Sequence, residues 1–166
     1  MTLPFMEALA AHDLAGASRE IGAALPAGMP DDLRHFLEFR TAQLRDDPSS
    51  QPWLGRLIVL DDDRGRRAIG SIGFHAPPDD DGRVEVGYRV EPEYRRQGVA
   101  TEVVRALFSW ANREHGVTRF RAATAPNNLA SQAVLARFGF HRTGSQMDDL
   151  DGLELVFELD DWTATG

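Results

Sequence analysis

RVEVGYRVEPEYRRQGVA, residues 83–100, places a strand pattern directly before a basic, glycine-containing turn. In its first half, 83–90, every second residue is apolar, which is typical of a β-strand with one buried face. After Gly98, the run VATEVVRALFSWANRE predicts an amphipathic helix over 99–114, which we expect to end near Gly116. A strand therefore leads through two arginines and a glycine into a long helix.

The turn around Gly98 has the composition of an anion site. The first turn of a helix exposes unpaired amide N–H groups and the positive end of the helix dipole, so a phosphate gains hydrogen bonds there. Gly98 and Ala100 leave room for close approach, and Arg95 and Arg96 add charges that pair well with phosphate oxygens. The turn is therefore a candidate diphosphate site, and a capped helix with surface arginines is the alternative interpretation.

The remaining patterns predict a mixed sheet with helices on its faces. Apolar spacing predicts helices over 5–25 and from Pro30 to Pro48, and alternation predicts a three-stranded antiparallel meander. A further strand, a short helix closed by Gly139 and two final strands follow. We expect an α+β or mixed α/β domain with a mostly antiparallel central sheet. The strands and the short helix are predicted at 55–63, 67–76, 83–90, 117–125, 127–138 (helix), 139–146 and 153–160.

Composition narrows the class of protein. The 166 residues are enough for one domain, 1–166, and too few for two. The chain has no cysteine, and all 18 of its basic residues are arginine, which excludes thiol chemistry and a catalytic lysine. A net charge of −8 argues against nucleic acid as a partner and is compatible with a cationic small substrate.

The sequence contains neither a candidate membrane span nor a candidate metal site. No apolar run approaches the roughly 20 residues of a membrane span, and no cationic segment precedes the first apolar residues. We therefore expect a cytoplasmic protein without a membrane partner. The five histidines are scattered and show no paired ligand spacing, so no metal site is expected.

Several motifs in this order resemble the GNAT superfamily of N-acetyltransferases, which use acetyl-coenzyme A. The resemblance covers about 53–158 and rests on the strand 83–90, the turn RRQGVA, the segment NNLAS and the pair RFGF at 137–140. Within this superfamily, the chain most resembles the branch that contains the ribosomal-protein N-terminal acetyltransferases.

The resemblance implies a set of cofactor contacts in this chain. Backbone amides of 95–100 would hold the pyrophosphate, with Thr101 nearby. The main chain of Tyr88 and Val90 would pair with the pantetheine arm, and the Val90 amide would donate to the developing oxyanion. Asn128 would contact the cofactor, and Ser131 would lie near its sulfur. The cofactor-binding set is thus Tyr88, Val90, Arg95, Arg96, Gln97, Gly98, Val99, Ala100, Thr101 and Asn128.

Acetyl transfer to an amine also needs a proton acceptor, because an amine of pKa about 8 to 10.4 is protonated at neutral pH. Glu85 is the first candidate, since strand alternation directs it to the face opposite Val84 and Val86. The alternative is that Glu85 simply belongs to the polar face of a half-exposed strand. His75 and Glu154 are weaker candidates.

Protonation of the leaving sulfur is the second requirement. Many members of the family carry a tyrosine four residues before the last glycine of the motif, where this chain has Leu135. The resemblance then moves the role of the acid to Ser131. Ser131 could instead only hydrogen-bond the sulfur, or cap its own helix.

The acceptor is left open between a peptide α-amino group and a small cationic amine. Two other readings are a non-catalytic acyl-coenzyme A binding domain, favoured by Leu135, and a phosphate-binding fold unrelated to acyl transfer. A homodimer is implied by resemblance alone. The family also begins with a strand before its first helix, and MTLPF at 1–5 is short for one.

Overall fold

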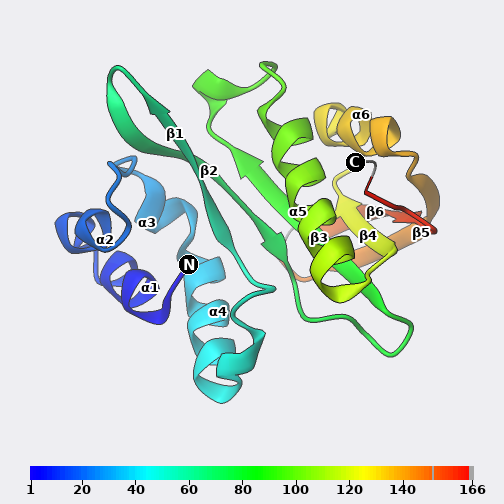
Figure 1. Cartoon of the computed structure of the whole chain (residues 1–166), viewed down its shortest axis with the longest axis horizontal. Helices are drawn as coiled ribbons and strands as arrows, with labels where there is room; N and C mark the ends of the chain where they lie inside the picture. The colour runs from blue at the N-terminus through cyan, green and yellow to red at the C-terminus, as the bar shows by residue number, and fades with distance from the viewer. Residues whose placement is uncertain (151, 165–166) are drawn as a thin grey trace.

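The computed structural model describes residues 1–150 and 152–164, and one six-stranded sheet forms its centre (Figure 1). The strand order is β1-β2-β3-β4-β6-β5. β3 and β4 are parallel, and the other neighbouring pairs of this sheet are antiparallel. The predicted mixed, mostly antiparallel sheet is confirmed. The strands are β1 Arg56–Asp62, β2 Gly65–Phe74, β3 Arg83–Val90, β4 Arg119–Thr124, β5 His141–Asp148 and β6 Gly152–Leu159.

The N-terminal helices differ from the sequence prediction. The segment predicted as one helix over 5–25 forms α1 Leu3–Ala10 and α2 Leu14–Ile21, so that prediction was wrong. His12 adopts a left-handed conformation with φ 58°, and the Asp13 carboxylate accepts a hydrogen bond from the Gly16 amide at 2.8 Å. A left-handed residue followed by a capping aspartate ends one helix and starts the next.

The second predicted helix is also divided, into α3 Met29–Asp32 and α4 Arg34–Asp46, with Leu33 between them. At the beginning of the chain, the Thr2 hydroxyl accepts a hydrogen bond from the Phe5 amide at 3.3 Å and caps α1. Within residues 1–150 and 152–164, therefore, α1 is the first element, and the strand expected from the family pattern does not precede it.

The C-terminal half matches the prediction closely. α5 covers Val99–His115 and α6 covers Leu129–Phe138, and each ends at a left-handed glycine, Gly116 at φ 69° and Gly139 at φ 90°. Short 3₁₀ turns at Pro48–Ser50 (η1) and Pro92–Tyr94 (η2) complete the helical elements of the described chain. A glycine at the end of an amphipathic run is the strongest local stop signal for a helix, which explains the accuracy here.

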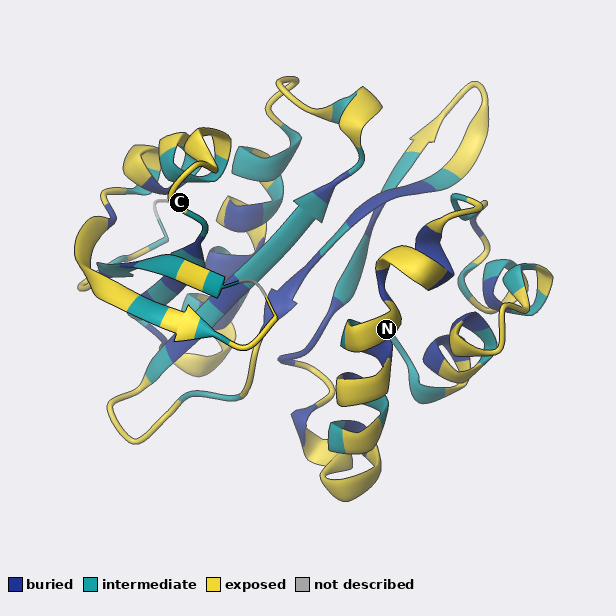
Figure 2. Ribbon diagram, turned by 180° about the vertical axis from the view of Figure 1, so that it is seen from behind, coloured by how far each residue is buried: buried dark blue, intermediate teal, exposed yellow. Residues whose placement is uncertain are grey.

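Helices pack on both faces of the sheet. Ile58 and Ile69 share one apolar cluster with residues of α5, whereas their chain neighbours Leu57 and Ala68 pack with residues of α1 and α4. Because consecutive strand residues point to opposite faces, α5 and the N-terminal helices lie on opposite sides of β1 and β2. The edge strand β5 is exposed over most of its length (Figure 2).

Stacked aromatic rings fill the core between the sheet and α5. The ring centroids of Phe108 on α5 and Phe120 on β4 are 3.8 Å apart, and Phe74 on β2 lies 6.2 Å from Phe120. All three side chains are fully buried. This packing fixes α5 against β2 and β4. Because β3 and β4 are parallel, the ends of both strands and the beginnings of α5 and α6 lie at one edge of the sheet.

Candidate active site

The turn between β3 and α5 presents a row of free backbone donors. α5 has no capping side chain, in contrast to α2 and α6, which are capped by Asp13 and Asn128. Among the described residues, the amide N–H groups from Arg96 to Thr101 make no hydrogen bond. An uncapped helix start with free amides is a ready site for an anion, which gains both hydrogen bonds and the favourable end of the helix dipole.

Two residues of this turn adopt left-handed backbone conformations. Gly98 has φ 88°, and Arg96 has φ 59°, a region that a residue with a side chain adopts only at a cost. A β-carbon built on Gly98 would meet no heavy atom within 4 Å, so the turn is open on the side where a side chain would stand. The geometry fits the diphosphate site predicted from the sequence.

Two side chains of the turn that were predicted to contact the cofactor bond instead to carbonyl groups of the protein. The Arg95 guanidinium donates from Nε to the Val90 carbonyl at 2.8 Å, and Gln97 donates from Nε2 to the Glu93 carbonyl at 2.8 Å. The Arg95 amide is itself bonded to the Pro92 carbonyl at 3.3 Å. These two side chains brace the turn from within, and the free donors begin at Arg96 rather than Arg95.

Beyond Glu85 and Arg121, β3 and β4 no longer pair, and we call the region between their unpaired ends, next to this turn, the opening. The two strands pair from Arg83–Arg119 to Glu85–Arg121, but β3 continues to Val90 without β4 as a neighbour. The Glu91 amide donates a hydrogen bond to the carbonyl of Ile69 on β2. Since successive amides of a strand point to opposite sides, the N–H groups of Tyr88 and Val90 face away from β2, toward the opening. The main-chain donors predicted to pair with the pantetheine arm thus face the opening.

On the other side of the opening, Ser131 lies in the first turn of α6. Its amide donates to Asn128 Oδ1 at 3.1 Å, so Asn128 is the helix cap and Ser131 does not cap the helix. The Ser131 hydroxyl lies 2.9 Å from the Tyr88 hydroxyl. Leu135, one turn later, is fully buried in the core. The Tyr88 hydroxyl was missed by the sequence reasoning, which used only the main chain of this residue.

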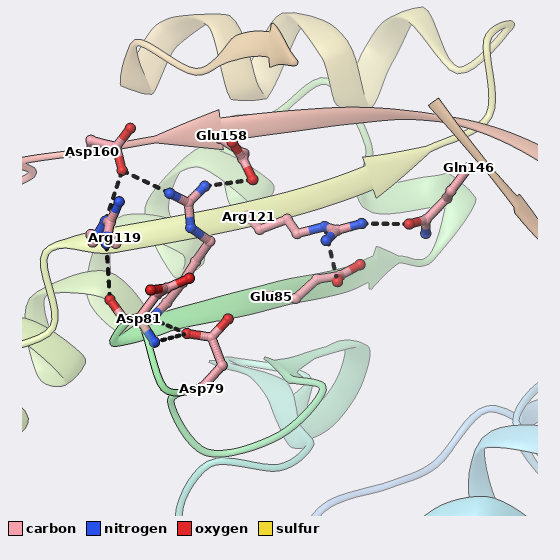
Figure 3. A network of polar contacts seen from close by, with 9 residues as sticks. Asp79, Asp81, Glu85, Arg119, Arg121, Gln146, Glu158 and Asp160 are labelled. Carbon is pink, nitrogen blue, oxygen red and sulfur yellow. Dashed lines mark hydrogen bonds and ion pairs between the residues drawn. The ribbon is translucent and has the colours of Figure 1, made fainter. Parts of the chain in front are cut away.

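The candidate proton acceptors gather on the sheet face away from α5. Glu85 Oε1 lies 3.7 Å from His75 Nδ1, and Glu85 Oε2 lies 3.4 Å from Arg121 Nε. Arg121 also donates to Gln146 Oε1 at 2.5 Å, and Gln146 donates to Glu154 Oε2 at 3.0 Å. Figure 3 shows Arg121 lying between Glu85 and Gln146, with both partners directed toward its guanidinium. The three predicted candidates therefore belong to one polar cluster.

The His75 ring packs directly over the backbone of Gly87 on the neighbouring strand. A β-carbon at Gly87 would lie 2.8 Å from His75 Nε2, so the absence of a side chain there makes room for the ring. Arg40, which is buried, donates to the His75 carbonyl. Loss of surrounding water lowers the pKa of His75 below its usual 6.5, and Arg40 and Arg121 lower this pKa further, while Glu85 and Glu154 raise it.

The surrounding charges form a separate network at the start of β3 and β4. Arg119 Nε and Arg83 Nη2 contact Asp160 Oδ1 at 3.1 Å and 3.0 Å, and Arg83 Nη1 contacts Glu158 at 2.6 Å (Figure 3). These pairs join the ends of three strands and lie away from the opening. The Arg83–Glu158 pair is partly buried, whereas the Arg119–Asp160 pair is exposed, and an exposed pair contributes little to stability.

Within residues 1–150 and 152–164, no three His, Asp or Glu side chains are grouped as a metal site. In the same residues, every helix is too short or too polar to cross a bilayer.

Comparison with known proteins places this geometry in a family. The model of the "Acetyltransferase (GNAT) domain" family matches residues 7–141. Among curated proteins, the N-acetyltransferase YoaA of Bacillus subtilis is 37% identical over 79 residues, which cover 48% of this chain and 45% of the relative. YjdG of the same organism is 35% identical over 72 residues, covering 43% of each chain. The chain thus spans less than half the length of these two relatives.

Solved structures support the fold. The ribosomal-protein-S5-alanine acetyltransferase from Vibrio fischeri superposes with a TM-score of 0.59 and 20% identity, over 82% of this chain and 75% of that one. At this identity the likeness shows the fold alone. The family match, which covers most of the chain, agrees with the uncapped α5, the opening beside β3 and the resemblance found in the sequence. The chain belongs to the GNAT acetyltransferase family.

Proposed function

We propose that this protein is an N-acetyltransferase that transfers the acetyl group of acetyl-coenzyme A to a primary amine by direct attack on the thioester. The observation that carries the proposal is the row of unpaired amide N–H groups from Arg96 to Thr101, next to the free edge of β3. A diphosphate needs the first feature, and an extended arm with amide groups needs the second.

The residues present fit coenzyme A. The amides of the turn would hold the diphosphate, and the outward-facing donors of Tyr88 and Val90 would pair with the pantetheine arm. Asn128 uses Oδ1 for the helix cap, which leaves its Nδ2 donor for the ligand. Arg96, whose side chain is exposed, adds a positive charge beside the same amides.

Chemistry at the thioester is assigned to groups on both sides of the opening. Glu85 accepts the proton of the attacking amine, directly or through water, and His75 lies close enough to share this role. The Val90 amide donates to the oxygen that becomes negative as the amine attacks. Ser131 donates to the departing sulfur, whose thiol pKa near 8.5 makes protonation helpful but not indispensable.

We propose that the acceptor is a positively charged amine. Carboxylates of Glu85 and Glu154 lie near the opening, and the chain carries a net charge of −8, which together favour a positively charged amine such as a peptide N-terminus or a polyamine-like metabolite. We further propose a cytoplasmic enzyme that works without a metal, a membrane or a nucleic acid partner, and homodimerisation as its mode of assembly.

A second candidate is a non-catalytic acyl-coenzyme A binding domain, favoured by Leu135 in place of the tyrosine of many relatives. Two measurements separate the candidates. Calorimetry with coenzyme A, and with adenosine diphosphate as competitor, tests whether binding needs the pantetheine arm. A panel of peptides and cationic amines, read by release of free thiol from acetyl-coenzyme A, tests transfer. Tight binding without release on the whole panel would favour the second candidate, and no binding would refute both.

A further inference from the structure

A hydrogen bond between two hydroxyl groups connects the sides of the opening. Tyr88 lies on β3 and Ser131 in the first turn of α6, 43 residues apart in the chain, and their hydroxyl oxygens are 2.9 Å from each other. Both side chains are partly buried. Each oxygen can donate or accept, so the pair can orient a proton toward a third group placed beside it.

Ser131 has few other constraints on its hydroxyl. Its amide is fixed by the Asn128 side chain, but this bond does not orient the Oγ–H group. Leu135 follows Ser131 by four residues, on the same face of α6, and fills the core without any polar atom. Among residues 1–150 and 152–164, the Tyr88 hydroxyl is therefore the hydrogen-bond partner that can direct the Ser131 proton.

The Tyr88 phenol is protonated, as a hydrogen-bond donor must be. Burial raises the pKa of its phenol above the usual 10, although the hydrogen bond to Ser131 opposes this shift. The phenol thus keeps its proton across the neutral range. The chain has two tyrosines, and the other, Tyr94, accepts a hydrogen bond from Arg67 Nε at 2.9 Å, away from Ser131.

We propose that Tyr88 is a positioning residue for the departing thiolate: its O–H donates to Ser131 Oγ, so that the Ser131 O–H is directed at the sulfur. This inference rests on the proposed function. As the nitrogen–carbon bond forms, the carbon–sulfur bond breaks and its electron pair stays on sulfur. Sulfur takes the Ser131 proton, Ser131 takes the Tyr88 proton, and Tyr88 regains one from water. The amine loses its proton to Glu85, which releases it to water, so the protons balance.

The test compares Tyr88→Phe with Tyr94→Phe, which removes a hydroxyl with a hydrogen bond of similar length outside the opening. We expect Tyr88→Phe to lower kcat about 10- to 100-fold, at or below the lower end of the range for general acid catalysis because Tyr88 acts through Ser131, with KM for acetyl-coenzyme A changed less than about twofold. Tyr94→Phe should leave kcat within about twofold. Ser131→Ala combined with Tyr88→Phe should be no slower than Ser131→Ala alone, because Tyr88 acts through Ser131.

A second measurement does not depend on turnover. The ultraviolet absorbance of the thiolate gives the pKa of the thiol of bound coenzyme A, which a directed hydroxyl should hold below its free value of about 8.5. We expect Tyr88→Phe to raise this pKa toward the free value and Tyr94→Phe to leave it unchanged. Thermal melting of each variant, with and without coenzyme A, verifies that both remain folded.

The outcomes distinguish this inference from the proposed function. Equal kcat and equal thiol pKa in the two phenylalanine variants would overturn the role of Tyr88 while the acetyltransferase assignment stands. If the wild-type chain binds coenzyme A but acetylates no amine, the thiol pKa alone decides the role of Tyr88. A wild-type chain that does not bind coenzyme A overturns both.

Discussion

Replacement of Gly98 by alanine separates the fold of α5 from its use as an anion site, because the same helix offers a matched control. Gly98 precedes α5 with φ 88°, and Gly116 follows it with φ 69°. A β-carbon at either position meets no heavy atom within 4 Å. Gly98→Ala and Gly116→Ala therefore impose a similar backbone cost and no clash within the described structure.

The expected stability cost is the same for both variants. A residue with a β-carbon in the left-handed region costs about 1–2 kcal/mol. For a chain of this length, this corresponds to a fall in Tm of about 2–8 °C. Differential scanning calorimetry without ligand should show comparable shifts for the two alanine variants.

Coenzyme A binding should distinguish them. The added methyl group at position 98 takes up open space next to the free amides of Arg96–Thr101, and we expect it to displace the diphosphate from at least one charge-assisted hydrogen bond. Such a bond contributes about 1.5–3 kcal/mol, so Kd should rise roughly 10- to 150-fold. Gly116→Ala should leave Kd within about twofold, as measured by isothermal titration calorimetry.

Equal affinities in Gly98→Ala and Gly116→Ala would refute the assignment of the turn. If Gly98→Ala does not fold, Gly98→Asn provides the same comparison, since asparagine tolerates the left-handed conformation better than alanine. The matched control is then Gly116→Asn.

Three further changes test the remaining site residues. Glu85→Gln should lower kcat about 10²- to 10⁴-fold with little change in coenzyme A affinity, measured by thiol release, and an unchanged kcat would exclude Glu85 as the base. Because the pKa of His75 is lowered on folding, the unfolded chain binds its proton first as the pH falls below about 6.5; stability should then decline toward acid pH, and His75→Gln should flatten this decline in urea titrations. A slope identical to wild type would contradict the shift. Asn128→Asp keeps the oxygen that caps α6 but removes the Nδ2 donor, so Tm should hold while Kd for coenzyme A rises; Asn128→Ala should in addition cost about 1 kcal/mol of stability. Unaltered binding by Asn128→Asp would remove Asn128 from the cofactor site.

Local signals in the sequence were sufficient for the C-terminal half. The alternation at 83–90 and the glycines at 98, 116 and 139 predicted β3, α5 and α6 within a residue or two, because strand periodicity and left-handed helix ends are properties of short segments. The same kind of reasoning failed near His12. An alanine-rich run concealed the left-handed residue and the Asp13 cap that divide α1 from α2.

By itself, the sequence determined the strands and the two C-terminal helices, and that a helix begins at a glycine after a basic turn, since these depend on neighbours along the chain. Only the tertiary structure decided what meets across the sheet. The early end of β3–β4 pairing, the Tyr88–Ser131 contact, and the Arg121 guanidinium beside Glu85 join residues 36 to 43 positions apart. Such contacts depend on strand order and on the parallel crossing through α5, which no local pattern specifies because the chain alone does not fix which strands become neighbours.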